Sequence, residues 1–540
     1  MINRAAFVTL LALQVCLVWA YPRYATEDGP SHLYNAAVNA ALHSGSWGIV
    51  GGFYRPNPRL VPNSTTFVIL KRLMKIFSPS SAEKILVTTY LVLFALSFFW
   101  TVRTVCAGSE HFLNWGLVLG SNWFLSMGFY NFCFGLVLFQ LSFGYWFKSR
   151  MRFGVWQWLV LFLSASLLYF SHLFCFLMTA LLIGIVALIE TLPEARRSRY
   201  ARGPTKALIH SVVLPETCFL VLLLLNPFAR VAQPQADPSQ GSLLANILHG
   251  LSFSRLTHVF YLLLDCYGFL SKTAVLLIGV LFVSAFYWTL VRSRERISAL
   301  SYAFAAISVV CFALYIFCPQ PFLGNGLLRE RAGWFALWGA FGFLASRTWN
   351  AQGKLLVSVI ASLVCALGLI SGTIWRRDVS RLLRPYDDAA RFVEPDKTML
   401  SVCYCVPGSA NPAVLRRLRI WPLEHAGDIT ALAARDISIA NYEGMGSGFP
   451  IEYLPDVNPA IRAPAVMENA NNPEVTDPLE YEKNTGKSID YVLVWGGPDV
   501  AGTSGRSSTL SAQLQARYTL IYSAPAPSLL RLFRKNLSIP

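Results

Sequence analysis

The sequence predicts a polytopic α-helical membrane protein with about eleven transmembrane helices and a C-terminal extracytoplasmic α/β domain. Of its 540 residues, 54% are hydrophobic and 14% are charged, and the mean hydropathy is +0.47. Unbroken apolar runs of about 20 residues recur along the chain, which is the length that a helix needs to cross roughly 30 Å of hydrocarbon. Residues 375–540 lack such runs and contain short strand-like and helix-like stretches instead.

The composition excludes several classes of protein. Soluble proteins contain about 25% charged residues, so the chain is neither an ordinary cytosolic enzyme nor a disordered scaffold. The apolar runs are too long for an outer-membrane barrel, whose strands alternate over about ten residues. Residues 1–374 carry 27 Lys and Arg against 11 Asp and Glu, whereas residues 375–540 carry 18 of each. Because the basic excess belongs to the membrane half, we expect no nucleic-acid partner.

Eleven apolar runs are predicted to span the membrane, and we interpret the first as an uncleaved anchor because bulky residues follow it. The predicted spans are 5–20, 84–103, 111–127, 129–147, 153–171, 173–191, 207–226, 273–291, 298–318, 333–347 and 355–374.

The distribution of basic residues predicts the orientation. With a cytoplasmic N-terminus, every loop that remains inside is basic, as the positive-inside rule requires. Those loops contain Arg103, Lys148, Arg150, Arg152, Arg196, Arg197, Arg199, Arg202, Lys206, Arg292, Arg294, Arg296, Arg347 and Lys354. An odd number of spans then exports the C-terminus. We therefore expect a multi-pass protein of the plasma (inner) membrane, with residues 1–374 in the membrane domain and 375–540 in the exported domain.

The first external loop, residues 21–83, has structure of its own. Residues 31–44 and 65–77 show apolar residues at helical spacing with a polar opposite face, and we predict two helices that lie on the membrane. In the tail, strands are predicted over 399–406, 491–495 and 518–522, and helices over 387–393, 429–440 and 509–516. These elements predict a small α/β domain.

An acidic pair, Glu27 and Asp28, lies just past the outer end of the first span, in the segment ATEDGPSH that covers residues 25–32. Two adjacent carboxyl groups can present one base to a nucleophile while the other orients it or tunes its proton affinity. The alternative is a solvated pair in which Asp28 caps the following helix. Local chemistry alone leaves both readings open.

The order of these features resembles the GT-C superfamily of membrane glycosyltransferases, which includes protein O-mannosyltransferases and lipid A aminoarabinose transferases. The resemblance covers the architecture of residues 1–374: a span, an acidic pair at the start of a long external loop, two amphipathic helices, and many further spans. It implies that the sugar arrives on a polyprenyl phosphate and that a first-loop acidic residue is the catalytic base. Relatives often have Asp-Glu where this chain has Glu27-Asp28, so either residue could be the base. We favour Asp28, which precedes Gly-Pro and a helix with His32 and Tyr34.

A lipid-phosphate donor needs cations at the outer membrane face, because the departing phosphate gathers negative charge. The loop predicted between spans nine and ten supplies Arg329, Glu330 and Arg331. Two arginines around a glutamate fit a phosphate clamp with its own orienting carboxylate. An interfacial ion pair that reaches the headgroups is the alternative.

His32, His172, Glu330 and Asp265 are further candidates for contacts with the substrate, since each falls near the outer boundary in this topology. Structural roles compete for each of them. The sequence has no nucleotide-binding loop, zinc motif or nucleophile elbow. It has no cluster of acids that demands a metal, so we expect no cofactor, and a divalent metal stays an open alternative.

The resulting hypothesis is a glycosyltransferase that moves a hexose or pentose from a polyprenyl-phosphate donor to a glycan, lipid or protein acceptor, with inversion. A secondary transporter or flippase is the alternative, although such proteins typically show repeated halves and ionisable residues at the membrane midplane. A third hypothesis is a non-catalytic scaffold with an exported binding domain.

Overall fold

The computed structural model describes residues 2–59, 61–151, 154–197, 257–264, 266–287, 297–318, 327–404, 415–446, 448–467, 473–497 and 508–536. The chain forms two compact units. The helical unit comprises Met1–Cys16, Thr88–Phe124 and Tyr130–Ser371, and the α/β unit comprises Leu17–Val87, Leu125–Phe129 and Gly372–Pro540.

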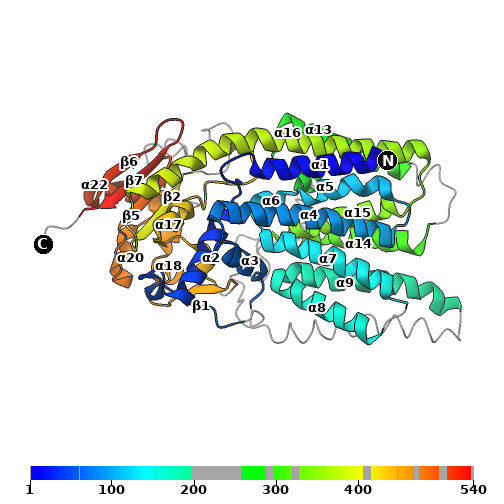
Figure 1. Cartoon of the computed structure of the whole chain (residues 1–540), viewed down its shortest axis with the longest axis horizontal. Coiled ribbons are helices and arrows are strands. Elements are labelled where there is room, and N and C mark those ends of the chain that lie inside the picture. The colour runs from blue at the N-terminus through cyan, green and yellow to red at the C-terminus, as the bar shows by residue number, and fades with distance from the viewer. Residues whose placement is uncertain are drawn as a thin grey trace. The chain divides into compact units, whose positions relative to one another are not determined.

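Long apolar helices running side by side make up the helical unit (Figure 1). Its helices are α1 (Ile2–Trp19), α4 (Pro79–Val105), α5 (Leu113–Gly120), α6 (Trp123–Met127), α7 (Tyr130–Ser149), α8 (Val155–Ser171), α9 (Leu173–Arg197), α13 (Phe269–Tyr287), α14 (Ala299–Phe317), α15 (Leu328–Ala345) and α16 (Ala351–Ala389), of which α1, α4, α6 and α16 also contribute residues to the α/β unit.

Four described helices are long and apolar enough to cross a membrane: Pro79–Val105, Leu173–Glu190, Ala299–Phe317 and Ala351–Phe392. Arg4–Trp19, Val155–Ser171 and Phe269–Ala285 are shorter apolar helices. The multi-pass α-helical class is thus supported by helix length and composition. The number of eleven spans stays a prediction, and the span expected at 207–226 lies outside the described residues.

The span predicted at 111–127 is not one continuous helix, because these residues include the two short helices α5 and α6. The helix α5 ends at Gly120, where the Asn122 side chain turns back and donates to the carbonyl of Leu119 at 2.8 Å. A side chain that satisfies the last carbonyl groups ends a helix. The chain then restarts as α6.

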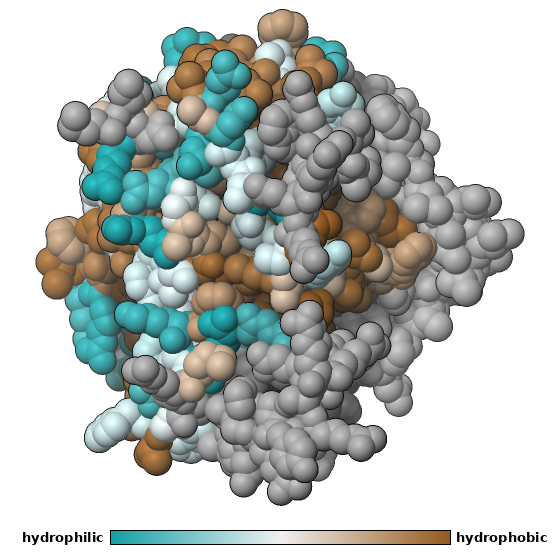
Figure 2. Space-filling model, turned by 90° about the vertical axis from the view of Figure 1, so that its right-hand side faces the viewer, coloured by the Kyte–Doolittle hydropathy of each residue, from teal (hydrophilic) through white to brown (hydrophobic). Residues whose placement is uncertain are grey.

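Basic residues meet at one end of the helical unit. The Arg4 guanidinium lies 3.2 Å from the Glu110 carboxylate, and Arg103 lies 3.8 Å from the same group. The C-terminus of α15 reaches this end too, since Ser109 donates to the Ala345 carbonyl at 2.5 Å. Figure 2 shows an end of the molecule where hydrophilic and hydrophobic side chains are interspersed. The geometry therefore brings basic helix ends together, although the direction in which they face stays a prediction.

A mixed five-stranded sheet with the order β3-β2-β5-β7-β6 forms the centre of the α/β unit. The strands are β2 (Thr398–Cys403), β3 (Ile437–Ser438), β5 (Tyr491–Trp495), β6 (Tyr518–Ser523) and β7 (Leu530–Lys535). The strands β3, β2 and β5 are parallel, and β5-β7-β6 are antiparallel. Every residue of β5 is buried, as expected for a strand covered on both faces.

The remaining elements of the α/β unit are short helices and a separate strand pair. They are α2 (Gly29–Ser44), η1 (Val50–Gly52), β1 (Tyr54–Pro56), α3 (Thr65–Leu73), η6 (Ala390–Phe392), η7 (Leu415–Arg417), α17 (Gly427–Ala434), η8 (Tyr442–Gly444), β4 (Ile451–Tyr453), α18 (Pro459–Arg462), α19 (Pro464–Met467), η10 (Pro473–Val475), α20 (Pro478–Thr485) and α22 (Thr509–Arg517). The predicted strands at 399–406, 491–495 and 518–522 and the helix at 509–516 are confirmed within about two residues where they are described. The predicted helix at 429–440 ends early, because Arg435 adopts a left-handed φ of 62° and β3 follows.

The first loop is built into the same unit as the C-terminal segment. The strand β1 pairs antiparallel with β4, so that Tyr54 lies opposite Tyr453. Ten of the sixteen residues of α2 are buried, including the polar Ser31, His32 and Asn35. The expectation that 31–44 lies on the membrane is therefore wrong: its polar face is buried against protein partners. The helix predicted at 65–77 is found as α3, and its place at the membrane surface stays a prediction.

Candidate functional site

The acidic pair is held in place by a short neighbouring segment of the α/β unit. The backbone N–H groups of Glu27 and Asp28 donate to the carbonyls of Ser126 at 3.2 Å and Met127 at 2.9 Å. The next residue, Gly128, has a φ of +85°, and a Cβ there would lie 2.7 Å from the nitrogen of Gly29. Only glycine allows this backbone conformation and this close approach without strain.

A buried arginine connects the two segments. Arg376 is 6% exposed, and its Nη2 donates to the Tyr24 hydroxyl at 3.1 Å and to Ser126 Oγ at 3.0 Å. Its guanidinium also lies 4.8 Å from the centre of the Tyr24 ring. Arg376 therefore joins the segment that carries the acidic pair, through Tyr24, to the segment that binds its backbone, through Ser126.

The carboxylate of Asp28 faces residues of the C-terminal segment. Asp28 occupies the N-cap position of α2, but its side chain makes no capping hydrogen bond. Its Oδ1 lies 3.6 Å from His425 Nε2, and burial together with the charge of Asp28 raises the pKa of the nearby Tyr442. The capping role that competed with function in the sequence is therefore not realised in the structure.

Glu27 has a different environment. Its Oε2 accepts a hydrogen bond of 2.6 Å from the backbone N–H of Trp421. A carboxylate that binds a backbone amide in this way is held in one orientation. Glu27 thus links the first loop to the segment that carries His425.

His32 forms a buried ion pair beside the acidic residues. Its Nδ1 lies 2.6 Å from Glu443 Oε1, and both side chains are almost completely buried. Burial alone would lower the pKa of His32, but the charge and hydrogen bond of Glu443, helped by Asp28 and the backbone of Gly128, raise it above the usual 6.5. We therefore place His32 in a positioning role one helical turn after Asp28.

Three further ionisable groups have strongly shifted pKa values. Burial, with the charge of Asp28, raises the pKa of Glu424 to about 7, and burial is the main reason that the pKa of Asp428 also rises to about 7. Burial, with the charge of His32, lowers the pKa of His425 to about 4. At neutral pH the imidazole next to Asp28 is therefore neutral. Groups shifted in this way gather at functional sites.

The sheet determines where these side chains meet. Trp421, Glu424 and His425 follow β2 in the chain, and Tyr442 and Glu443 follow β3. Both strands are parallel, so the segments after them leave the sheet at the same edge. Open α/β sheets bind ligands at the carboxyl ends of their strands. The acidic pair from the first loop contacts the segment that follows β2 at this edge, through His425 and Trp421.

Other predicted site residues lie in the helical unit. Arg331 and His172 both contact the Phe132 ring: the guanidinium lies 5.7 Å from its centre, and the imidazole lies 5.1 Å from it in an edge-on arrangement. The structure thus brings Arg331 and His172 together around one aromatic ring.

Arg329, Glu330 and Arg331 lie in the first turn of α15, and not in the loop that the sequence predicted. Residues two apart on a helix do not face each other. Arg329 Nε donates to the Cys318 carbonyl, and the Arg331 guanidinium lies beside the Phe132 ring. The phosphate clamp stays a prediction. Asp265 lies outside the described residues.

The sequence analysis missed Arg376, Glu424, His425, Tyr442 and Glu443. One signal was present, since His425 is the only histidine in residues 375–540 and follows Glu424 directly. The others carry no local pattern, because they reach the acidic pair only through the fold. Among the described residues, no group of three His, Cys, Asp or Glu side chains is arranged to hold a metal ion.

Comparisons with known proteins find similarity among solved structures. No protein-family model matches the sequence, and no curated protein matches it. The structure of ArnT from Cupriavidus metallidurans in the apo state is similar over 99% of this chain and 98% of that one, with 12% sequence identity and a TM-score of 0.40. A TM-score of this size does not establish a shared fold, so the function must be inferred from the site.

Proposed function

We propose that this chain is a GT-C-type glycosyltransferase of the plasma (inner) membrane that moves a sugar from a polyprenyl-phosphate donor to an extracytoplasmic acceptor. The acceptor is a glycan, a lipid or a protein that carries the attacking hydroxyl. The observation that carries the proposal is the environment of Asp28. This carboxylate follows shortly after the first helix in the chain, makes no capping hydrogen bond, and lies close to the neutral imidazole of His425 and to Tyr442.

Asp28 acts as the general base. It takes the proton of the acceptor hydroxyl while the oxygen attacks the anomeric carbon, and the bond from that carbon to the lipid phosphate breaks. The configuration inverts, and the polyprenyl phosphate leaves with the bonding electron pair. His425 and Tyr442 orient the carboxylate, while Glu27 holds the loop through Trp421.

Arginine side chains of α15 stabilise the departing phosphate. Arg331 is the stronger candidate because it shares Phe132 with His172, which can contact a phosphate or a sugar hydroxyl. Arg329 and Glu330 lie in the same helical turn. A fixed guanidinium favours a transition state in which negative charge grows on phosphate oxygens.

Transfer of labelled sugar from a panel of polyprenyl-phosphate sugars tests the proposal, using the purified full chain. We expect Asp28→Asn to reduce turnover by about 10² to 10⁴-fold, the contribution typical of a general base. Glu27→Gln should cost less, because its amide oxygen can still accept the Trp421 N–H. A chelator should leave turnover unchanged if, as the sequence predicts, no divalent metal takes part.

Asp456→Asn is the matched control. Asp456 pairs with Arg462 at an exposed site of the α/β unit, so its loss should leave turnover unchanged. Product that survives both Asp28→Asn and Glu27→Gln would refute the catalytic assignment. Movement of substrate across proteoliposomes without a new glycosidic bond would favour the transporter or flippase. The absence of both transfer and transport would favour the scaffold.

A second experiment tests the phosphate site. We expect Arg331→Gln to lower kcat/KM for the donor by about 100-fold, the order of loss seen when one transition-state donor is removed. Arg103→Gln is the control, since Arg103 lies at the other end of the helical unit and is 55% exposed. Equal effects of the two substitutions would contradict a phosphate role for Arg331.

A further inference from the structure

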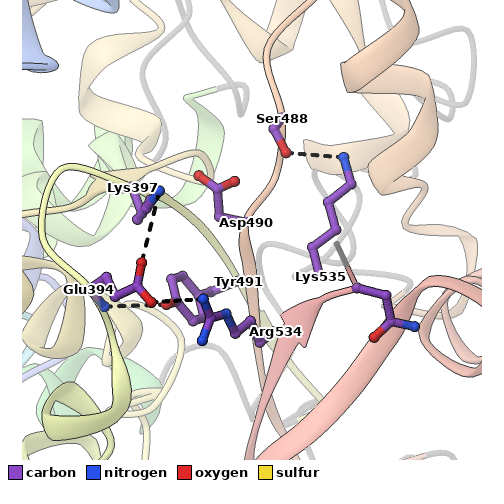
Figure 3. Close-up of a pocket in the computed structure, with 8 residues that line it drawn as sticks. Glu394, Lys397, Ser488, Asp490, Tyr491, Arg534 and Lys535 are labelled. Atoms are coloured by element: carbon purple, nitrogen blue, oxygen red, sulfur yellow. Dashed lines mark hydrogen bonds and ion pairs between the residues drawn. The ribbon is translucent and has the colours of Figure 1, made fainter. Parts of the chain in front are cut away.

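The α/β unit contains a polar cavity of about 260 Å³ at a different edge of the sheet from Asp28. It lies where β2 and β5 begin and β7 ends, and Figure 3 shows the side chains that line it. Antiparallel pairing of β5 and β7 places Tyr491 opposite Arg534. The start of β5 and the end of β7 therefore both line the cavity. The candidate catalytic residues follow the opposite ends of the parallel strands.

The hydrogen bonds of Asp490 leave part of its carboxylate available. Its Oδ2 accepts from the N–H and the hydroxyl of Thr398, both at 3.1 Å. Its Oδ1 accepts no hydrogen bond from any described residue. In the view of Figure 3 this carboxylate lies between Lys397 and Lys535. The cavity therefore offers a fixed acceptor, and basic side chains line the same space.

The charges around the cavity are balanced. Arg534 lies 2.7 Å from Glu394, and Lys535 lies 2.7 Å from Glu482, just beyond the lining. Lys397 also lies 4.0 Å from Glu394, and Asp490 supplies a further negative charge. An anionic ligand would approach the carboxylates, and a cationic ligand would approach Lys397 and the paired bases. Neither kind of ligand is favoured by charge.

A hydroxyl group matches such a surface, because it donates one hydrogen bond and accepts two. Several hydroxyls on one small ring can donate to Asp490 and accept from Lys397 and Arg534 at the same time. The volume lies just below the range of about 300–1,000 Å³ typical of drug-sized ligands, which suits a small sugar. We propose that this cavity binds a neutral carbohydrate. The proposal does not depend on the role of Asp28.

Saturation-transfer NMR with neutral glucose, galactose and mannose oligosaccharides tests this site on the purified full chain. The detergent should have no sugar headgroup, so an amine-oxide detergent replaces the usual maltosides. We expect binding by the wild type and a loss of about tenfold or more in affinity for Asp490→Asn and for Arg534→Gln, since each removes a charge-assisted hydrogen bond.

Both substitutions are chosen to preserve the fold. An Asn at 490 can still accept the Thr398 N–H, and the Arg534 side chain is 45% exposed. The matched control is Asp456→Asn, which removes an exposed carboxylate of the same unit and should bind sugar as the wild type does. Thermal unfolding curves that coincide with the wild type confirm that any loss is local.

Three results would overturn the proposal. They are no sugar binding by the wild type at millimolar concentration, sugar binding that both substitutions leave intact, and binding of inorganic phosphate without binding of sugar. Because sugar binding is measured without a lipid donor, a failed transferase assay leaves this test unaffected. Conversely, Asp490→Asn can fail to bind sugar while Asp28 remains active.

Discussion

Two buried carboxyl groups of the α/β unit change protonation near neutral pH. Glu424 and Asp428 both have a pKa of about 7, and His425 has a pKa of about 4. Burial is the first cause in every case, and neighbouring charges add to it. The number of protons held by this cluster therefore depends on pH, and so does the stability of the α/β unit.

Asp428 provides a direct test of this linkage. Because its folded-state pKa of about 7 exceeds its usual 3.8, the folded protein retains a proton that the unfolded chain releases. The group favours folding below pH 4, and this contribution, on the order of 4 kcal/mol at most, is lost as the pH rises towards 7. The substitution Asp428→Asn removes this pH-dependent loss of folding stability. The Asn side chain can still accept the hydrogen bond from the Ser438 hydroxyl.

Thermal unfolding at pH 5 and pH 8 measures the effect. We expect the Tm of Asp428→Asn, relative to the wild type, to be higher at pH 8 than at pH 5. The exposed Asp456→Asn control should show no such difference. A Tm difference that is the same at both pH values would contradict the raised pKa.

At the scale of elements, the pairing of β1 with β4 joins the first loop to the C-terminal segment. The rings of Tyr54 and Tyr453 lie 4.4 Å apart, and their hydroxyls are hydrogen-bonded at 2.8 Å. The Tyr54 hydroxyl donates to that of Tyr453, which in turn donates to the Ser438 carbonyl in β3 at 2.6 Å. The strand pair is therefore anchored to the edge of the main sheet.

A disulfide across this pair tests the register. Arg55 lies directly opposite Glu452, and opposed residues in antiparallel strands have Cα atoms about 4.5–5.5 Å apart, which a disulfide spans without strain. We expect Arg55→Cys with Glu452→Cys to cross-link on mild oxidation, as detected by mass spectrometry of the joined peptides. Arg55→Cys with Asp456→Cys is the control, and cross-linking of both pairs to the same extent would argue against the register.

For the whole molecule, the orientation in the membrane stays a prediction, and the basic helix ends are the basis for it. Arg4 and Arg103 share Glu110 at one end of the helical unit, and lysines and arginines are retained on the cytoplasmic side. We therefore expect this end to face the cytoplasm and the C-terminal segment to be exported.

Single cysteines in a variant whose 11 native cysteines are replaced test this orientation. A membrane-impermeant maleimide added to intact cells should label Asp456→Cys. It should label Lys354→Cys only after permeabilisation, because residue 354 is predicted to lie inside. The reverse labelling pattern would invert the topology and place Asp28 on the cytoplasmic side.

Local patterns were sufficient for most helices and strands and for the acidic pair. The apolar runs that became α4, α7, α9 and α14 and the buried strand β5 can be recognised from neighbouring residues alone. The same is true of Glu27 and Asp28, because an acidic pair just after an apolar span is visible without a fold.

Only the tertiary structure decided which residues surround that pair and which face of α2 is buried. His425 is about 400 residues from Asp28 in the chain, and β2 and β3 place the segments that follow them at one edge of the sheet. The polar face of α2 predicted a surface helix, but Asn35 is paired with Asn441 in the interior. Hydropathy reports the polarity of a residue, whereas burial depends on partners that distant segments supply.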